Sequence, residues 1–239
     1  MNRFFINSPL NAGQSLQLSD TVYHHWCKVL RAKIGDTAIL FNGTGGEYTA
    51  TLTDISKQFA TVHITDHNLI DRTLPYHITL AQAISKGERM DYTIQKACEM
   101  GVSAIQLIIS ERSDRLRYER DNKKLAHWQG IAIAACEQCG MNIIPQILAP
   151  ISLVEYVANC TDKLKLVMAL GSSNFAPSTP LADTISILVG AEGGLTDDET
   201  NLAITHGFAP WTLGERILRT ETAGIVAMAS LQMLAMMDG

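Results

Sequence analysis

Charged residues gather in one short stretch near the end of the sequence. The segment LGERILRTETAG, 213–224, carries Glu215, Arg216, Arg219 and Glu221. An arginine guanidinium can bind a carboxylate or a phosphate through two parallel hydrogen bonds, and an arginine is rarely buried without a partner. The segment therefore predicts either a loop that binds an anionic group or arginines that pair with their neighbouring glutamates at a helix start.

Glycines cluster in a second stretch just upstream. The segment ISILVGAEGGLTDDE, 185–199, runs from a buried-strand pattern into Gly190, Gly193 and Gly194, and then into a capping-box pattern that begins at Thr196. Glycine permits close approach of the backbone to a ligand and leaves N–H groups unhindered at a helix N-terminus. The spacing matches neither a Walker A loop nor the dinucleotide fingerprint. We interpret the stretch as a ligand loop, with a plain glycine-rich connection as the alternative.

From residue 77 onward, strand and helix patterns alternate, and this alternation positions both stretches. Strands are expected at 77–83, 104–109, 164–170, 185–190 and 210–213, and helices at 90–101, 123–139, 153–159, 197–206 and 220–237. Such alternation is typical of a mainly parallel α/β sheet, whose ligands bind at the carboxyl ends of its strands. Because each stretch follows a strand, we expect the two to wall one crevice.

The first part of the chain predicts a small barrel-like β domain. Strands are expected at 37–41, 47–53 and 59–64, with the turn-forming NGTGG between the first two. Ser19 is expected to cap a short helix with a shared apolar face of Val22, Trp26, Val29 and Leu30. The polar, proline-bearing stretch 68–77 marks the boundary to the α/β part.

Composition limits the class of protein. The 239 residues are 46% hydrophobic with a net charge of −5, as in an ordinary globular protein, and this charge speaks mildly against nucleic acid as a partner. Cations at 110–124 still permit a local basic patch, although a solvated helix face explains them equally well. The apolar run 223–237 is too short to span a bilayer, and the first residues lack an apolar leader, so the expected compartment is the cytoplasm.

The cysteines and histidines predict no metal site. Five scattered cysteines argue against a disulfide framework. Cys136 and Cys139 lack the further cysteines or histidines that would complete a zinc site, so we interpret them as small residues on a helix. Adjacent helical positions point about 100° apart, so His24 and His25 favour RNA contact or plain surface over a metal pair.

These motifs carry a resemblance to a known family. GAEGGLTDDE, followed by LGERILRTETA and a long apolar helix, resembles the SPOUT methyltransferases. Further segments, HHWCKVLRAKIGD, FNGTGGEYTA, KGERMDYTIQKACEMGV and KKLAHWQGIAIAACEQCG, extend the likeness over almost the whole chain. In order and spacing they resemble the bacterial 16S ribosomal RNA (uracil-N3)-methyltransferase family, known as RsmE.

The resemblance implies an α/β fold with two domains. Residues 1–72 would form a PUA-like RNA-binding β-barrel, and 73–239 a SPOUT methyltransferase domain with a trefoil-knotted parallel sheet, the cofactor site and a dimer interface. It implies a cytoplasmic homodimer without metal that uses S-adenosyl-L-methionine to methylate N3 of a uridine in 16S rRNA, either free or in the assembled 30S subunit.

The same resemblance implies roles for individual residues. Those expected to bind the cofactor are Leu170, Gly171, Gly190, Ala191, Glu192, Gly193, Gly194, Leu213, Gly214, Ile217, Leu218, Arg219 and Thr222. Those expected to contact RNA are Arg3, His24, Lys28, Arg31, Lys86, Arg89, Arg112 and Arg216. For catalysis, Arg219 is expected to stabilise the uridine anion, with Glu192 or Glu221 as weaker candidates for the base that removes the N3 proton.

The chain departs from the family pattern at two positions. Ala191 stands where the family usually has proline, which should only loosen the loop because the glycines remain. Met141 stands where the family usually has arginine, which removes a cation that would meet phosphate. Two other functions stay open: a SPOUT enzyme that methylates a ribose 2′-hydroxyl of RNA, and a ribosome-binding factor without catalysis, which the intact glycines disfavour.

Overall fold

The chain folds into two compact units. The computed structural model describes residues 1–113, 118–169 and 177–237. Unit 1 comprises Met1–Thr73 and Cys136–Ile144, and unit 2 comprises Leu74–Ala135 and Pro145–Gly239. The sequence did not predict that the short segment Cys136–Ile144 would pack with the N-terminal residues.

Unit 1 is built on a five-stranded sheet. Its strands are β1 (Asn2–Phe5), β2 (Ser15–Gln17), β3 (Thr37–Phe41), β4 (Glu47–Ile55) and β5 (Ala60–Asn68), in the order β1-β3-β4-β5-β2. The predicted hairpin joins β3 to β4, and Gly43, Gly45 and Gly46 in its turn have positive φ angles, which glycine adopts without a steric penalty. The sequence missed β1 and β2, because three or four residues are too few to show a period of two.

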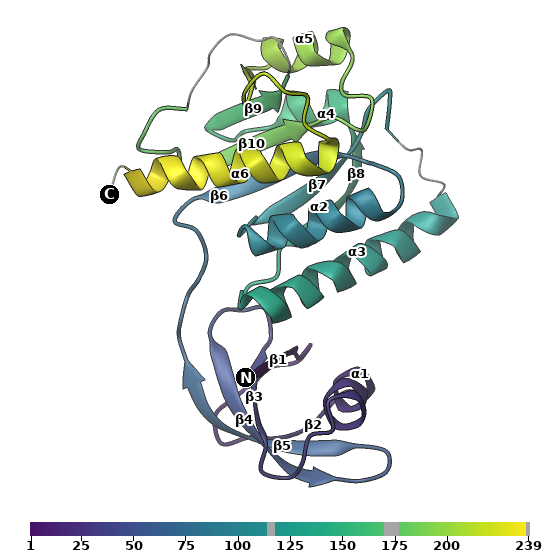
Figure 1. The fold of residues 1–239 in the computed structure, drawn as a ribbon, viewed down its shortest axis with the longest axis vertical. Coiled ribbons are helices and arrows are strands. Elements are labelled where there is room, and N and C mark those ends of the chain that lie inside the picture. Colours follow the sequence, from purple (N-terminus) through teal and green to yellow (C-terminus); the bar gives the residue numbers. More distant parts are fainter. Residues whose placement is uncertain (114–117, 170–176, 238–239) are drawn as a thin grey trace. The chain divides into compact units, whose positions relative to one another are not determined.

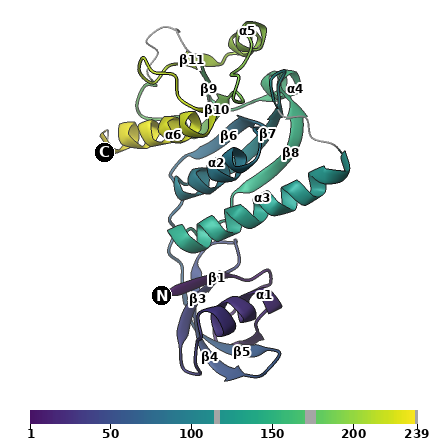
Figure 2. The ribbon, with the colours of Figure 1, turned by 45° about the vertical axis from the view of Figure 1, so that its right-hand side comes forward.

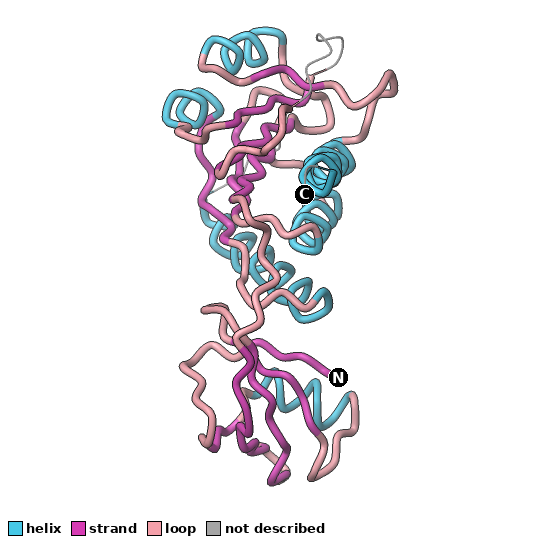
Figure 3. Tube along the Cα trace, turned by 90° about the vertical axis from the view of Figure 1, so that its left-hand side faces the viewer, coloured by secondary structure: helices cyan, strands magenta, loops and turns pink. Residues whose placement is uncertain are grey.

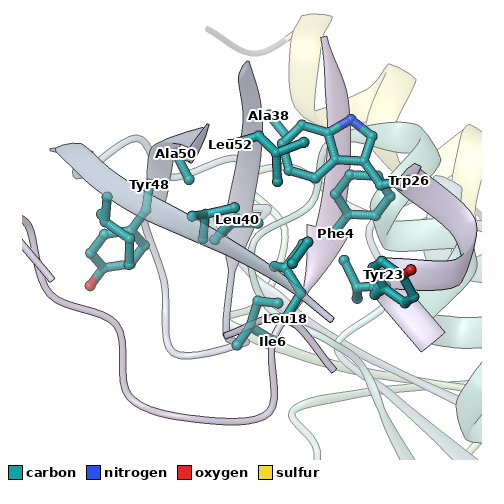
Figure 4. Packing of buried hydrophobic residues seen from close by; sticks show 14 of the residues in the cluster. Phe4, Ile6, Leu18, Tyr23, Trp26, Ala38, Leu40, Tyr48, Ala50 and Leu52 are labelled. Carbon is teal, nitrogen blue, oxygen red and sulfur yellow. The ribbon is translucent and has the colours of Figure 1, made fainter. Parts of the chain in front are cut away.

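The core of unit 1 surrounds Trp26. Phe4 on β1 packs against it with ring centroids 5.3 Å apart, and Leu40 and Leu52 belong to the same apolar cluster (Figure 4). Trp26 is 1% exposed, so it anchors the short helical segment to the sheet.

That helical segment changes its winding partway along. The helix α1 (Asp20–Tyr23) begins with the predicted Ser19 cap and continues as a π-helical turn, η1 (His24–Val29), closed by the Leu30 N–H on the His25 carbonyl at 2.9 Å. Because a π turn is wider than an α turn, Val29 and Leu30 leave the buried face and are 58% and 45% exposed. The expectation that both would share a face with Trp26 was wrong.

Unit 2 contains a six-stranded parallel sheet, which confirms the predicted α/β class. Its strands are β6 (His77–Ala83), β7 (Ala104–Ile109), β8 (Gln146–Ser152), β9 (Leu164–Met168), β10 (Thr184–Val189) and β11 (Ala209–Trp211). The order is β11-β9-β10-β6-β7-β8, and every pairing is parallel. The sequence missed β8, an edge strand that contains Pro150 and therefore does not follow an ordinary strand pattern.

Helices cover both faces of this sheet (Figure 3). The helices α2 (Glu88–Glu99) and α6 (Thr220–Met237) lie side by side on one face, while α4 (Leu153–Asn159) and α5 (Asp197–Thr205) pack on the other (Figures 1 and 2). The remaining helix, α3 (Tyr118–Cys139), is joined to α2 by a hydrogen bond from Trp128 Nε1 to Asp91 Oδ1 at 3.1 Å. Within the described part of the chain, no helix combines the length and apolar character needed to cross a membrane.

A glycine sets how closely α6 approaches the sheet. A side-chain Cβ on Gly224 would lie 3.0 Å from Leu80 Cδ1 on β6 and 3.6 Å from Val189 Cγ2 on β10. The helix backbone therefore packs directly on the central strands. Its first residue, Thr220, is brought in this way to the carboxyl end of β10.

Candidate active site

A cavity of about 490 Å³ opens at the carboxyl ends of β9, β10 and β11. These three strands are neighbours in the sheet, so the loops after them meet at one edge. The cavity is lined by predicted residues from both chemistry-bearing stretches: Gly190, Ala191, Glu192, Gly193, Gly194, Leu213, Ile217 and Leu218. The predicted Leu170 and Gly171 follow β9 and lie outside the described residues.

The glycine loop after β10 requires glycine at its first position. A Cβ on Gly190 would lie 2.6 Å from both the Gly194 carbonyl carbon and the Leu195 nitrogen, closer than real Cβ atoms approach backbone. Gly194 has a φ of +71° and donates its N–H to the Ala191 carbonyl at 2.9 Å, which closes the turn. Ala191 itself is buried, so its backbone and its small side chain form part of the cavity wall.

The second stretch forms the apolar lip of the cavity. Thr212 Oγ1 donates to the Ala169 carbonyl at 2.5 Å, which ties the end of β11 to the end of β9. Gly214 follows with a φ of +81°, which turns the chain back over the cavity. Ile217 lines the cavity and is still 79% exposed, so it is available to cover an apolar ligand surface.

A buried polar network, missed by the sequence reasoning, supports the floor of the site. Gln82 is fully buried on β6, and its Nε2 donates to Thr220 Oγ1 at 2.9 Å and to the Gly190 carbonyl at 3.4 Å. Thr220 Oγ1 donates to the same carbonyl at 2.5 Å. The start of α6 and the glycine loop are therefore held together. The only signal in the sequence was a glutamine flanked by two alanines near the end of the strand 77–83.

Glu192, one of the two predicted bases, already has partners. Its Oε1 accepts a hydrogen bond from the Lys86 N–H at 3.1 Å and forms an ion pair with Arg89 Nη1 at 2.7 Å. Partial burial raises the pKa of Glu192, but hydrogen bonds from its own N–H, from Lys86 and from Arg89 outweigh it and lower the pKa below its ordinary value. A carboxylate stabilised in its charged form is a weaker proton acceptor.

The other predicted catalytic residues lie beside the cavity rather than among its lining residues. The Arg219 side chain is 79% exposed, and its Nη1 lies 3.9 Å from Glu221 Oε1. The other oxygen, Glu221 Oε2, is buried and accepts no hydrogen bond from the described residues. Gly214 and Thr222 are likewise absent from the lining.

The basic residues predicted to contact RNA fall into two groups. In unit 1, His24, Lys28 and Arg31 are exposed. Arg3 is only 12% exposed there, because its guanidinium pairs with Glu47 Oε2 at 2.6 Å and donates to the Gly140 carbonyl and to Asn142 Oδ1. The guanidinium of Arg3 is therefore engaged by partners within unit 1.

In unit 2, two of the predicted cations line the cavity and the other two contact Glu192 in its wall. Lys86 and Arg89 are exposed where β6 leads into α2. Arg112 and Arg216 are exposed too, and both line the cavity. Among the described residues, Arg216 makes no ion pair or hydrogen bond, whereas Arg112 donates to two carbonyls of the glycine loop.

The candidate zinc residues behave as packing residues. Cys136 is fully buried against Phe41 and Met141, and Met141 is 7% exposed. The departure at Met141 thus places an apolar side chain in the interior of unit 1. Over residues 1–113, 118–169 and 177–237, no cluster of three or more His, Cys, Asp or Glu side chains is placed to hold a metal ion.

Comparison with known proteins supports the chemistry of this cavity. Residues 72–232 match the family model of an RNA methyltransferase domain, and residues 18–65 match that of an RNA methyltransferase PUA domain. The ribosomal RNA small subunit methyltransferase E of Buchnera aphidicola from Acyrthosiphon pisum is 39% identical over 234 residues, covering 96% of this chain and 92% of the relative.

Two solved structures share the fold over nearly the full length. Ribosomal RNA small subunit methyltransferase E of Neisseria gonorrhoeae, bound to S-adenosyl methionine, is 40% identical with a TM-score of 0.91 and 98% coverage of both chains. A putative methyltransferase of Legionella pneumophila, solved with the same cofactor, is 38% identical with a TM-score of 0.91, covering 97% of this chain and 96% of that one. The chain therefore belongs to the RNA methyltransferases, in the family of ribosomal RNA small subunit methyltransferase E.

Proposed function

We propose that this protein transfers a methyl group from S-adenosyl-L-methionine to N3 of a uridine in the 16S rRNA of the small ribosomal subunit. The observation that carries the proposal is the cavity at the ends of β9, β10 and β11, whose glycine loop has no space for a side chain at Gly190. Membership of the family and the cofactor seen in two neighbours support it.

The residues present fit this cofactor. A cavity of about 490 Å³ lies within the usual range of small-molecule sites, roughly 300–1,000 Å³. The backbone at Gly190–Gly194 allows close approach, and Ile217 and Leu218 supply apolar surface for an adenine ring. When bound, S-adenosyl-L-methionine supplies an electrophilic methyl group, and the protein aligns the two reactants.

The uridine must lose its N3 proton, and this step needs groups from the chain. N3 lies on the Watson–Crick edge, so the base must be unpaired and exposed to the cavity. We assign Arg219 to stabilise the negative charge that develops on the base. Glu221 Oε1, 3.9 Å from Arg219 Nη1, orients the guanidinium. We assign the proton to Glu221 rather than to Glu192, because Glu221 Oε2 accepts no hydrogen bond from the described residues whereas Glu192 Oε1 is bound by Lys86 and Arg89.

Exposed basic side chains in each unit would hold the RNA backbone. We assign this role to His24, Lys28 and Arg31 in unit 1, and to Lys86 and Arg216 in unit 2. Phosphate contacts of this kind determine affinity and register without reading sequence. In this proposal, residues 1–72 bind RNA, and residues 73–239 contain the catalytic site.

The assembly is proposed to be a cytoplasmic homodimer. The end of α6 leaves Met233, Met236 and Met237 exposed at 59%, 75% and 80%. Exposed apolar groups of this kind often mark a protein interface, which agrees with the dimer that the family resemblance implies.

The first experiment is calorimetric titration of the protein with S-adenosyl-L-methionine, together with the Arg219→Ala variant. We expect saturable binding at about one per protomer in both proteins, because Arg219 is not among the lining residues. Methyl transfer by the variant should fall about 100-fold, the usual cost of removing one group that stabilises a developing anion. Equal loss of binding and turnover would contradict the role of Arg219.

The second experiment is a radiolabelled methyl assay on free 16S rRNA and on 30S subunits. Label at uracil N3 supports the proposal, whereas label at a ribose 2′-oxygen would make the protein an RNA 2′-O-methyltransferase. If the protein binds 30S subunits but neither binds the cofactor nor transfers a methyl group, it is a ribosome-binding factor without catalysis.

A further inference from the structure

Two arginines near the cavity are bonded to the glycine loop instead of facing solvent alone. Arg112 Nη1 donates to the Gly193 carbonyl at 2.6 Å and to the Leu195 carbonyl at 3.4 Å. Arg89 Nη1 pairs with the Glu192 carboxylate of the same loop at 2.7 Å. The Arg112 hydrogen bonds reach the backbone of the loop, whereas the Arg89 ion pair reaches only a side chain. Hydrogen bonds from a charged donor are stronger than neutral ones, so Arg112 restrains the loop backbone directly.

The backbone around Arg112 is tied to the same region. The turn after β7 is closed by Ser113 Oγ, which donates to the Ser110 carbonyl at 2.8 Å. Within this turn, Glu111 donates its N–H to Glu199 Oε1 at 2.7 Å. The other oxygen, Glu199 Oε2, accepts the Thr196 N–H at 2.9 Å. One carboxylate on α5 therefore links the Arg112 turn to the residue just after the glycine loop, which fixes where the guanidinium can reach.

The glycine loop is shaped to receive the arginine. A Cβ on Gly193 would lie 3.0 Å from Arg112 Cδ and 3.5 Å from its Cβ. The absence of a side chain at Gly193 thus lets the arginine stem lie directly on the loop. A side chain at Gly193 would press on the arginine stem, whereas one at Gly190 would meet the backbone of Gly194 and Leu195.

We infer that Arg112 is a positioning residue of the cofactor loop and not a phosphate contact. By holding the carbonyls of Gly193 and Leu195, it fixes two peptide planes at the wall of the cavity. This inference rests on the proposed function for the identity of the cofactor. It changes the role that the sequence resemblance implied for this arginine, which was contact with RNA.

The two roles differ in whether lysine can replace Arg112. A phosphate contact requires a positive charge, which lysine supplies as a point charge. Arg112 lays its aliphatic stem beside Gly193 while Nη1 donates to two carbonyls, and this contact uses the planar guanidinium that lysine lacks. Arg112→Lys therefore separates the two roles without a change of charge, and Arg112→Ala shows the full effect.

The test measures S-adenosyl-L-methionine affinity without RNA, and RNA affinity without cofactor over a range of salt concentrations. For Arg112→Lys and Arg112→Ala we expect cofactor binding weakened by about tenfold or more, with the salt dependence of RNA binding unchanged. Arg216→Ala is the comparison, because Arg216 is exposed and assigned to phosphate, so it should show the opposite result: the slope of the salt dependence of RNA binding should decrease by about 1. Chemical denaturation of each variant checks that it is folded.

Normal cofactor affinity in Arg112→Lys would overturn the inference. A decrease in the slope of the salt dependence of RNA binding in Arg112→Ala would overturn it too. The proposed function fails separately, if the unmodified protein does not bind the cofactor at all. In that case the loop is tested by the Gly193→Ala variant alone and combined with Arg112→Ala. We expect the destabilisation caused by Gly193→Ala to shrink when Arg112 is absent, since the contacting Cδ is gone; additive effects would refute the contact.

Discussion

Arg3 in unit 1 has surroundings opposite to those of Arg216 and Arg219 in unit 2. In unit 1, the Arg3 side chain is 12% exposed and bonds to Glu47, the Gly140 carbonyl and Asn142. In unit 2, Arg216 is exposed without a bonded partner among the described residues, and Arg219 is 79% exposed with one contact at 3.9 Å. The same side chain thus holds a structure together in one unit and is left available for a ligand in the other.

Burial is the physical cause of the difference. A guanidinium removed from water must find compensating acceptors, and the acceptors of Arg3 come from residues far apart in the sequence. At the cavity mouth water solvates the arginines, so a nearby carboxylate contributes little to stability. The comparison therefore predicts that disrupting the contacts of Arg3 lowers the free energy of unfolding without changing RNA affinity. Removing an arginine at the cavity mouth should lower RNA affinity without changing the free energy of unfolding.

The largest effect is expected for Glu47→Ala. Glu47 accepts from Arg3 at 2.6 Å and from Arg72 at 2.9 Å, and removing it leaves a mostly buried guanidinium without its anion. We expect the free energy of unfolding to fall by about 3 kcal/mol, measured by chemical denaturation. Arg72→Ala is the control and should cost about 1 kcal/mol or less, because Arg72 is 35% exposed. Loss of RNA affinity in folded Glu47→Ala would break the comparison.

The same carboxylate predicts a pH dependence. Burial raises the pKa of Glu47, but hydrogen bonds from Arg72 and Arg3 outweigh it and hold the pKa below its ordinary value of 4.5. A lowered pKa in the folded state means that the stabilisation is complete above pH 4.5 and is lost as the pH falls through the folded pKa. Denaturation at several pH values should show a steeper loss below pH 4.5 in the unmodified protein than in Glu47→Ala. Parallel curves would argue against the pairing.

The next largest effect is expected for Gly190→Ala, which tests the backbone of the cavity instead of its charges. The new Cβ would require movement of the backbone at Gly194 and Leu195, at a cost of roughly 1–3 kcal/mol. Cofactor affinity should fall by roughly 10- to 100-fold, measured by calorimetry. Gly130→Ala on α3 is the matched control, since no atom lies within 4 Å of its Cβ position. Normal affinity in Gly190→Ala would place the cofactor elsewhere.

The smallest effect is expected for Arg216→Ala. Its side chain is exposed and unpaired within the described residues, so the free energy of unfolding should change by about 0.5 kcal/mol or less. RNA affinity should fall slightly, and the slope of its salt dependence should decrease by about 1. Binding measured at several salt concentrations checks this. A large loss of stability would show that this arginine is structural after all, which would remove the contrast with Arg3.

Local patterns were enough to predict most elements of unit 2 and the two stretches that form the cavity. The strand patterns at 77–83 and 104–109 match β6 and β7 residue for residue, and the helix at 220–237 matches α6. Buried parallel strands and glycine turns show strong local signals because each residue's neighbours in sequence set its periodicity. Short edge strands and the π turn at η1 lack that signal, and the sequence missed them.

By itself, the sequence determined what each side chain is able to do: glycine at 190 permits close approach, and arginine at 3, 112 or 216 is able to bind an anion or a carbonyl. Only the tertiary structure decided which of these abilities is used. Arg3 meets Glu47 and Asn142, which are 44 and 139 residues away in sequence, and Arg112 meets Gly193 across 81 residues. Partners this far apart in sequence are brought together by the packing of whole sheets and helices, so no local pattern of residues predicts these contacts.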